Sequence, residues 1–276
     1  MKIFALGPAG SYGHEVALIA AQKLNLENSV ISFQPTNTSV LSAAEHEEAM
    51  GVVPIENSTY GDVIEVLEYL VRRAFKYPLR IVGQVELQVN HCLLAASGTN
   101  NMGELQGLIS HPQAIGQCQD SIARWGITNI EPATSTAAAA KFVAENPQKK
   151  FGALASSLAA REYGLTTLAQ NVQTFTNNTT RFFIFGKSRI SEPTGDDKTV
   201  LVFKIKNEPA ALTEALLPLA VRRINMSTVH SVSLGGWNYG FYLEIDGHQS
   251  DENIAVGLER MQISTEELMV LGSFRK

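Results

Sequence analysis

The sequence predicts an α/β protein followed by a smaller module of the ferredoxin type. Through residue 187, short apolar strands, polar turns and helices follow one another repeatedly. This repeat predicts an α/β fold with largely parallel sheets. The polar stretch 188–197, which contains Pro193 and Gly195, indicates a linker. Beyond it the order strand, helix, strand, strand, helix, strand occupies roughly 80 residues, which is typical of a ferredoxin-like module.

Apolar runs bounded by turn residues predict the strands of the first portion, and apolar residues at helical spacing predict its helices. Strands are expected at 3–6, 51–55, 80–89, 91–95, 108–109, 151–154 and 182–185. Helices are expected at 12–24, 61–73, 113–125, 135–145 and 156–162. In the second portion we expect strands at 199–206, 226–234, 239–246 and 267–271, and helices at 209–223 and 251–261.

Composition excludes several classes of protein. A net charge of -5 argues against a nucleic-acid partner, which requires a basic face. The apolar run at 3–6 is too short for a signal peptide, and no stretch is long enough to span a membrane. We therefore expect a cytoplasmic protein without a membrane partner. Cys92 and Cys118 stand in apolar or helical runs and are expected to be buried free thiols.

Four polar turns each stand just before a predicted helix: GPAGS (7–11), PIENST (54–59), SHPQA (110–114) and TSTAA (134–138). A helix N-terminus carries unpaired amide donors and a partial positive charge. Open α/β sheets gather such termini at one edge. Each Ser or Thr taken alone is explained as a helix cap. The four together, with the Thr-Thr-Arg turn at 179–181, favour a site for a small molecule with several negative charges.

Other kinds of site are not supported by the residue patterns. Gly7, Gly10 and Gly13 do not have the spacing of a dinucleotide-binding loop. The histidines show no metal-ligand spacing, and no Gly-x-Ser-x-Gly motif marks a nucleophile. No metal or organic cofactor is therefore expected. His111 before Pro112 is either a substrate contact or a turn residue.

The segment NNTTRFFIFG (177–186) places Arg181 where a polar loop enters a buried strand, so a partner that is anionic or well hydrogen-bonded is expected for it. This segment and GPAGSYGHEVA, GVVPIENSTYG, ISHPQAIGQC, STAAAAKFV and GALASSLAAREYGL resemble prephenate dehydratases, in the same order across residues 3–187. The C-terminal module resembles the ACT regulatory domain of that family. The resemblance implies a carbon–oxygen lyase that converts prephenate to phenylpyruvate, water and carbon dioxide in phenylalanine biosynthesis.

The resemblance also implies an architecture. The catalytic domain, 1–188, would consist of two lobes like those of periplasmic binding proteins, with the active site in the cleft between them. The chain would cross between the lobes near 75–85 and 160–175. A linker at 189–197 would lead to the ACT domain at 198–276. Because the chain starts at the first strand, we expect no preceding chorismate mutase segment and hence a monofunctional enzyme.

The family's catalytic Thr-Arg-Phe falls on Thr180, Arg181 and Phe182. Arg181 would clamp a carboxylate of the substrate, Thr180 would hydrogen-bond the departing hydroxyl, and Phe182 would pack on the ring and exclude water. The remaining substrate-binding positions fall on Ser11, Asn57, Ser58, Ser110, His111, Gln113, Ser135 and Thr136. Ser11 replaces the family's usual threonine and keeps the hydroxyl.

The C-terminal module departs from the family pattern. Glu208-Pro-Ala-Ala-Leu replaces Arg-Pro-Gly-Ala-Leu, and His230-Ser-Val-Ser replaces Glu-Ser-Arg-Pro. The corresponding effector positions are Asn207, Ala210, Ala211, Leu212 and Ser231. The module would bind phenylalanine, bind another amino acid, or bind nothing and serve in assembly. A homodimer or homotetramer is expected.

Three other functions stay open beside prephenate dehydration. The same cleft motifs suit an arogenate dehydratase, which acts on the transaminated substrate. A prephenate decarboxylase that does not aromatise the ring is disfavoured by the intact motif at 180–182. The chain could also be an inactive sensor of small anions or amino acids with the same fold.

Overall fold

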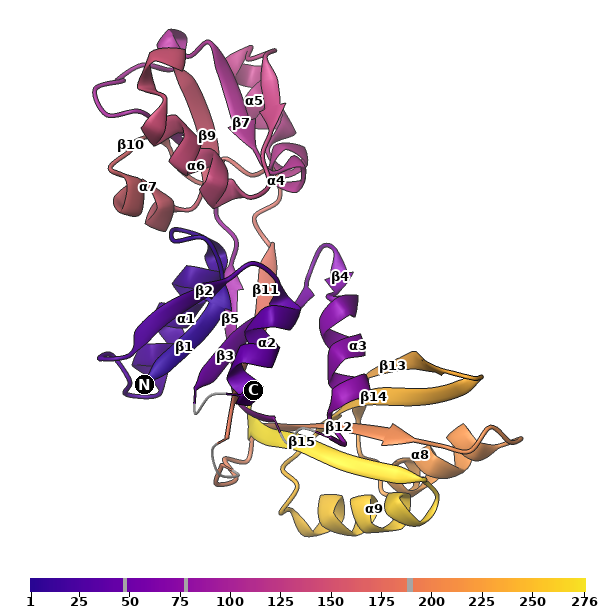
Figure 1. The fold of residues 1–276 in the computed structure, drawn as a ribbon. Coiled ribbons are helices and arrows are strands. Elements are labelled where there is room, and N and C mark those ends of the chain that lie inside the picture. The colour runs from indigo at the N-terminus through magenta and orange to yellow at the C-terminus, as the bar shows by residue number, and fades with distance from the viewer. Residues whose placement is uncertain (47–48, 77–78, 188–190) are drawn as a thin grey trace.

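The computed structural model describes residues 1–276 except 47–48, 77–78 and 188–190, and it contains three sheets with their helices. Figure 1 shows them in a row, with the second lobe at the top, the first lobe in the middle and the C-terminal module at the bottom. The expected α/β fold with a ferredoxin-like C-terminal module is confirmed. Among the helices of the described residues, none is long and apolar enough to cross a membrane.

The first lobe is built on a mixed sheet. Its strands are β1 (Lys2–Leu6), β2 (Val30–Gln34), β3 (Met50–Asn57), β4 (Gly61–Asp62), β5 (Arg80–Gln88) and β11 (Thr179–Gly186), in the order β2-β1-β3-β11-β5 with β4 beside β3. Its helices are α1 (Tyr12–Lys23), α2 (Asn37–His46) and α3 (Ile64–Arg73). Strand β11 runs antiparallel to both neighbours, β3 and β5, because it enters the sheet from the second lobe. The expectation of largely parallel sheets is therefore wrong at β11.

The second lobe has a mixed sheet as well. Its strands are β6 (Cys92–Ala95), β7 (Gly107–Ser110), β8 (Ile130–Pro132), β9 (Phe151–Ala155) and β10 (Thr166–Ala169), in the order β10-β6-β9-β7-β8. Its helices are α4 (Pro112–Gln117), α5 (Gln119–Trp125), α6 (Thr136–Glu145) and α7 (Ser157–Tyr163), with short 3₁₀ turns η1 (Met102–Glu104) and η2 (Pro147–Lys149). Only β7 pairs in parallel, with β8 and β9, among the described strands of this sheet.

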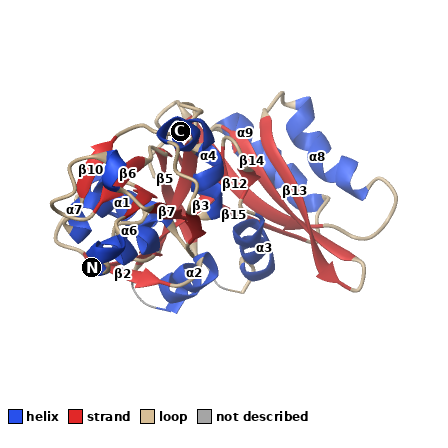
Figure 2. Cartoon of the chain, turned by 90° about the horizontal axis from the view of Figure 1, so that it is seen from above, coloured by secondary structure: helices blue, strands red, loops and turns tan. Residues whose placement is uncertain are grey.

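The C-terminal module is an antiparallel sheet with two helices. Its strands are β12 (Asp197–Lys204), β13 (Met226–Gly235), β14 (Asn238–Asp246) and β15 (Glu267–Arg275), in the order β13-β14-β12-β15. Helices α8 (Ala211–Val221) and α9 (Glu252–Ile263) cover one face. The other face packs on the first lobe, where α3 lies between the two sheets (Figure 1, Figure 2).

Strand β12 shows how one sequence serves both faces of this sheet. Val200 and Val202 belong to the core shared with the first lobe, whereas Leu201 and Phe203 belong to the core under α8 and α9. Side chains alternate across a strand, so a continuous apolar run indicates burial on both faces. The C-terminal module is thus packed into the hydrophobic core of the first lobe.

The crossings between the lobes lie later than expected from the resemblance. The chain leaves the first sheet after Gln88 and joins the second at Cys92, and it returns between Ala169 and Thr179. Residues 80–85, expected at the first crossing, belong to strand β5 of the first lobe. The boundaries 1–188, 189–197 and 198–276 stay a prediction, and residues 188–190 lie outside the described residues.

Several elements differ from the sequence expectation. The sequence does not predict strands β2, β8 and β10 or helix α2, because their short segments mix polar and apolar residues without a clear period. Strand β4 occupies the start of the expected helix 61–73, which begins only at Ile64. The expected helix 113–125 is interrupted at Cys118, which has φ -113° and ψ 16°. Helix α8 begins at Ala211 rather than at Pro209, because Ala210 has φ 67°. Both cysteines are buried and free, as expected.

Candidate active site

A cavity of about 330 Å³ opens between the two lobes. The first lobe contributes Leu6, Gly7, Ser11, Tyr12, Gly13, Pro54, Asn57, Thr180 and Phe182. The second lobe contributes His111, Gln113, Ala114, Gln117, Thr134, Ser135 and Thr136. The crossings contribute Val89, His91 and Asn178. The structure therefore brings together most of the substrate-binding residues that the sequence predicts.

Three of these residues are helix caps as well as cavity residues. The Ser11 hydroxyl accepts from the His14 amide at 3.1 Å and donates to the Leu6 carbonyl at 2.9 Å. The Ser135 hydroxyl accepts from the Ala138 amide at 3.0 Å, and His111 Nδ1 accepts from the Gln113 amide at 3.3 Å. The helix-cap and binding-site interpretations of these turns are therefore compatible, because the capped termini of α1, α4 and α6 border the cavity.

The hydroxyl of Thr180 has a defined direction. The Asn57 Oδ1 atom accepts from the amides of Thr59 and Tyr60, both at 3.0 Å. Its Nδ2 atom consequently faces β11, where it donates to Thr180 Oγ1 and to Asn178 Oδ1, both at 2.8 Å. Because Thr180 Oγ1 accepts this bond, its own proton is available to a group in the cavity.

Two of the predicted substrate-binding serines do not line the cavity. The Ser58 hydroxyl donates to the Asn177 carbonyl at 2.9 Å and accepts from the Thr179 amide at 3.0 Å, so it fixes the start of β11. Ser110 is fully buried and donates to the Leu154 carbonyl at 2.7 Å, which ties β7 to β9. For both residues the expected contact with substrate is replaced by a structural hydrogen bond.

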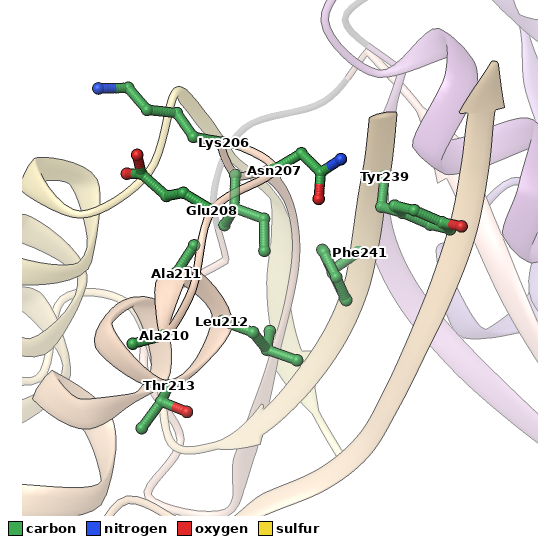
Figure 3. A pocket seen from close by; sticks show the side chains of 10 residues that line it. Lys206, Asn207, Glu208, Ala210, Ala211, Leu212, Thr213, Tyr239 and Phe241 are labelled. Atoms are coloured by element: carbon green, nitrogen blue, oxygen red, sulfur yellow. The ribbon is translucent and has the colours of Figure 1, made fainter. Parts of the chain in front are cut away.

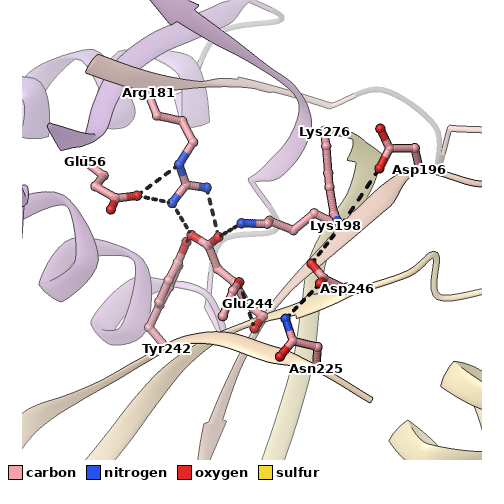
Figure 4. A network of polar contacts seen from close by, with 10 residues as sticks. Glu56, Arg181, Asp196, Lys198, Asn225, Tyr242, Glu244, Asp246 and Lys276 are labelled. Atoms are coloured by element: carbon pink, nitrogen blue, oxygen red, sulfur yellow. Dashed lines mark hydrogen bonds and ion pairs between the residues drawn. The ribbon is translucent and has the colours of Figure 1, made fainter. Parts of the chain in front are cut away.

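Arg181 points away from the cavity, so the expected clamp on a substrate carboxylate is not what the structure shows. Alternation along β11 places Thr180 and Phe182 on the cavity face and Arg181 on the opposite face. There the Arg181 guanidinium donates to Glu244 of the C-terminal module through Nη1 at 2.8 Å and Nη2 at 2.9 Å. It also donates to Glu56 of β3 at 2.8 Å (Figure 4).

Glu244 is the centre of this polar network. Its side chain is fully buried, and Lys198 Nζ also donates to it at 2.7 Å. The Tyr242 hydroxyl donates to its other oxygen. Although burial alone would raise the pKa of Glu244, the hydrogen bonds and charges of Arg181 and Lys198 lower it. The partner that the sequence requires for Arg181 is thus a carboxylate of the protein itself.

Among the polar side chains of the cavity wall, sequence reasoning missed five: Tyr12, His91, Gln117, Thr134 and Asn178. Tyr12 and Asn178 are neighbours of predicted site residues in their turns, which was the available signal. His91 reaches the cavity because the chain crosses from the first lobe to the second at this point. Gln117 reaches it at the end of α4, where the helix is interrupted. Among the described residues no group of three or more His, Cys, Asp or Glu side chains is placed to hold a metal ion.

A second cavity, of about 220 Å³, lies in the C-terminal module. It is lined by Ile205, Lys206, Asn207, Glu208, Ala210, Ala211, Leu212, Thr213, Tyr239 and Phe241. Figure 3 shows Leu212 and Phe241 facing one another below the backbone of Asn207 and Glu208. Four of the five predicted effector positions line this cavity, whereas Ser231 lies on an exposed part of β13.

Replacing Asn57 by Asp tests the direction of the Thr180 proton. The carboxylate would keep the bonds from Thr59 and Tyr60 but would accept from Thr180, so the hydroxyl proton would be drawn out of the cavity. We expect kcat of the reaction in this cavity to fall by roughly 10²-fold, the cost of losing one positioned donor. An unchanged kcat at saturating substrate would contradict this orientation.

A double-mutant cycle tests the role of Arg181. Because Arg181→Gln leaves the buried Glu244 carboxylate with one cationic partner, Lys198, in place of two, it should cost about 3–5 kcal/mol of unfolding free energy. Combining it with Glu244→Gln should be less destabilising than the sum of the single changes by about 1–3 kcal/mol. Glu56→Gln is the control, expected within about 1 kcal/mol because that side chain is 43% exposed. Strict additivity of Arg181→Gln and Glu244→Gln in denaturant unfolding would show that the two residues do not interact.

Comparison with known proteins agrees with this geometry. The family model described as prephenate dehydratase matches residues 3–190. Arogenate dehydratase 2 of Petunia hybrida is 31% identical over 291 residues, which cover 99% of this chain and 71% of that protein. The prephenate dehydratase of Arthrobacter aurescens, solved in complex with L-Phe, has a TM-score of 0.88 and 27% identity, over 100% of this chain and 90% of that one.

A further solved structure, described as GqqA, a novel type of quorum quenching acylases, has a TM-score of 0.87 and 28% identity, over 100% of this chain and 98% of that one. The fold by itself is therefore associated with more than one described activity. The family match is sequence-based and spans both lobes and the whole cavity wall between them. The chain accordingly belongs to the prephenate dehydratase family.

Proposed function

We propose that the protein is a dehydratase that converts prephenate to phenylpyruvate, water and carbon dioxide. The observation that carries this proposal is the Thr180 hydroxyl, which Asn57 orients so that its proton is available in the cavity. Family membership supplies the reaction class. The cavity wall of hydroxyls, amides and imidazoles suits a small molecule with two carboxylates.

The proposed reaction depends more on well-placed hydrogen-bond donors than on a strong acid, base or nucleophile. As the carbon–carboxylate bond breaks, its electron pair enters the ring, and the hydroxyl on the opposite carbon departs, so the ring becomes aromatic. The Thr180 hydroxyl would donate a hydrogen bond to the departing oxygen, and Phe182 would pack beside the ring. Donors fixed in advance at a developing charge account for much of the rate in such sites. Arg181 would act by holding β11 in place.

Arogenate is the second candidate substrate, because the petunia relative is named an arogenate dehydratase. Arogenate carries an ammonium group where prephenate has a keto group. The cavity presents capped helix N-termini at Ser11 and Ser135, which favour negative charge. We therefore expect prephenate to be the better substrate by kcat/KM when both are assayed with the purified protein.

The Thr180→Ala variant tests the assigned chemistry against a binding-only sensor. A sensor needs the cavity but not this hydroxyl. We expect the variant to bind prephenate with nearly unchanged affinity in calorimetry and to lose turnover by roughly 10²–10³-fold, measured as phenylpyruvate formed. Full turnover in the variant would remove Thr180 from the mechanism, and an inactive wild type that still binds prephenate would favour the sensor.

We further propose that the second cavity binds an amino-acid effector with an apolar side chain, as the structure of the Arthrobacter aurescens relative was solved with L-Phe. Leu212 and Phe241 would contact the side chain of the effector. Both Ala210 and Ala211 lie at the beginning of α8, next to the backbone of 206–208. Replacement of the family's glycine by Ala210 still leaves an open cavity of about 220 Å³.

Phenylalanine at millimolar concentration should bind the protein in calorimetry and lower its prephenate turnover. Leu212→Arg should abolish both effects, because the new side chain would fill the cavity. Leu217→Arg is the matched control, since Leu217 is on the same helix and 52% exposed. Equal responses of the two variants would place the effector elsewhere.

A further inference from the structure

A hydrogen-bonded row of three side chains crosses the wall of the active-site cavity. The Tyr12 hydroxyl lies 2.8 Å from His91 Nδ1, and His91 Nε2 lies 2.6 Å from Gln117 Oε1. Tyr12 comes from α1 of the first lobe, His91 from the crossing before β6, and Gln117 from α4 of the second lobe. All three line the cavity, and His91 is only 2% exposed.

The row can hold His91 in either charge state. Gln117 Oε1 only accepts, so His91 Nε2 carries a proton. The Tyr12 hydroxyl can donate to Nδ1 of a neutral imidazole. It can equally accept from Nδ1 of an imidazolium, because its own proton then goes to the Asn90 carbonyl at 2.8 Å. A proton can therefore be added to His91 without moving any heavy atom.

The other imidazole of the cavity is placed differently. His111 Nδ1 accepts from the Gln113 amide and caps α4. Protonation of that nitrogen would replace an acceptor by a donor and would break the cap. Of the two imidazoles that line the cavity, His91 is the one whose hydrogen-bond partners suit the charged form.

The proposed reaction consumes one proton in each turnover. Prephenate carries two negative charges and phenylpyruvate one, while carbon dioxide and water are neutral. The electron pair of the broken carbon–carbon bond stays in the ring, and the departing hydroxide must take up a proton to become water. A threonine hydroxyl can orient that oxygen but is too weak an acid to be the net source.

We infer that His91, acting through the hydroxyl of Tyr12, supplies the proton that the departing hydroxide takes up, an inference that rests on the proposed function. With substrate bound, the Tyr12 hydroxyl turns its proton from the Asn90 carbonyl to the leaving oxygen. The Tyr12 O–H bond then breaks as a new O–H bond forms on that oxygen. The His91 Nδ1–H bond breaks in the same sequence and restores the tyrosine. His91 is left neutral, and solvent reprotonates it before the next turnover.

The electrostatic surroundings set the expected pH dependence. Burial lowers the pKa of His91, opposed by its hydrogen bond to Gln117. The other titratable groups that act on Tyr12 are Glu15 on α1 and the thiols Cys92 and Cys118. Burial raises the pKa of both thiols, so they stay neutral. Since the reacting form is the imidazolium, kcat/KM should fall as the pH rises through the His91 pKa.

The test is the pH profile of kcat/KM with prephenate for the wild type and three variants. His91→Gln should lower kcat by roughly 10²-fold or more and remove the fall at rising pH. His111→Gln, from the same cavity, should keep that fall at the wild-type pH. Gln117→Glu places a carboxylate on His91 Nε2, so the fall should move about 1–3 pH units higher.

Three results would overturn the proton-donor role. They are a flat wild-type profile, a fall that persists in His91→Gln, or a fall that does not move in Gln117→Glu. The last comparison uses a nearly isosteric change and does not depend on His91→Gln being folded. Failure of the proposed function would be distinguished by a wild type that forms no phenylpyruvate at any pH.

Discussion

The buried ion pair between Arg181 and Glu244 is the interaction on which the arrangement of the molecule depends. Strand β11 carries Thr180 and Phe182 on one face and Arg181 on the other, so a single strand borders the cavity and the C-terminal module. Two opposite charges removed from water are tolerated only when each is closely paired. Glu244 meets this condition with Arg181, Lys198 and Tyr242. Strand β11, which borders the cavity, is therefore also tied to the C-terminal module through Glu244.

This arrangement suggests how a ligand in the second cavity, that of the C-terminal module, would influence the first cavity. Phe241 and Tyr239, in the wall of that cavity, belong to β14, which also carries Glu244. An effector that shifts β14 would alter the geometry of the ion pair, and Thr180 is the next residue along β11. Val200 and Val202 of the C-terminal module share one hydrophobic core with Phe183 of the first lobe. A shift of β14 would therefore move two packed sheets against each other, not a free loop.

Much of the candidate site could be predicted from the sequence, because helix caps are local. Ser11, His111 and Ser135 cap helices within three residues of themselves, and these capped turns border the cavity from both lobes. The role of Arg181 could not be predicted, since its partner lies 63 residues away in the C-terminal module. Alternation along 179–186 does indicate that residue 181 faces away from residues 180 and 182, and the family motif obscured that signal. His91 and Gln117 meet only through tertiary packing, so no local pattern marks them.

The most direct measurement is a crystal structure of the Thr180→Ala variant with bound prephenate, which the slowed reaction should preserve. We expect the substrate hydroxyl to lie at the space left by the Thr180 hydroxyl, with its carboxylates at the capped helix termini, and Arg181 still paired with Glu244. The account would be contradicted by a structure in which Arg181 has left Glu244 and binds a carboxylate of prephenate. In that case Arg181 would not lie on the face of β11 opposite the cavity.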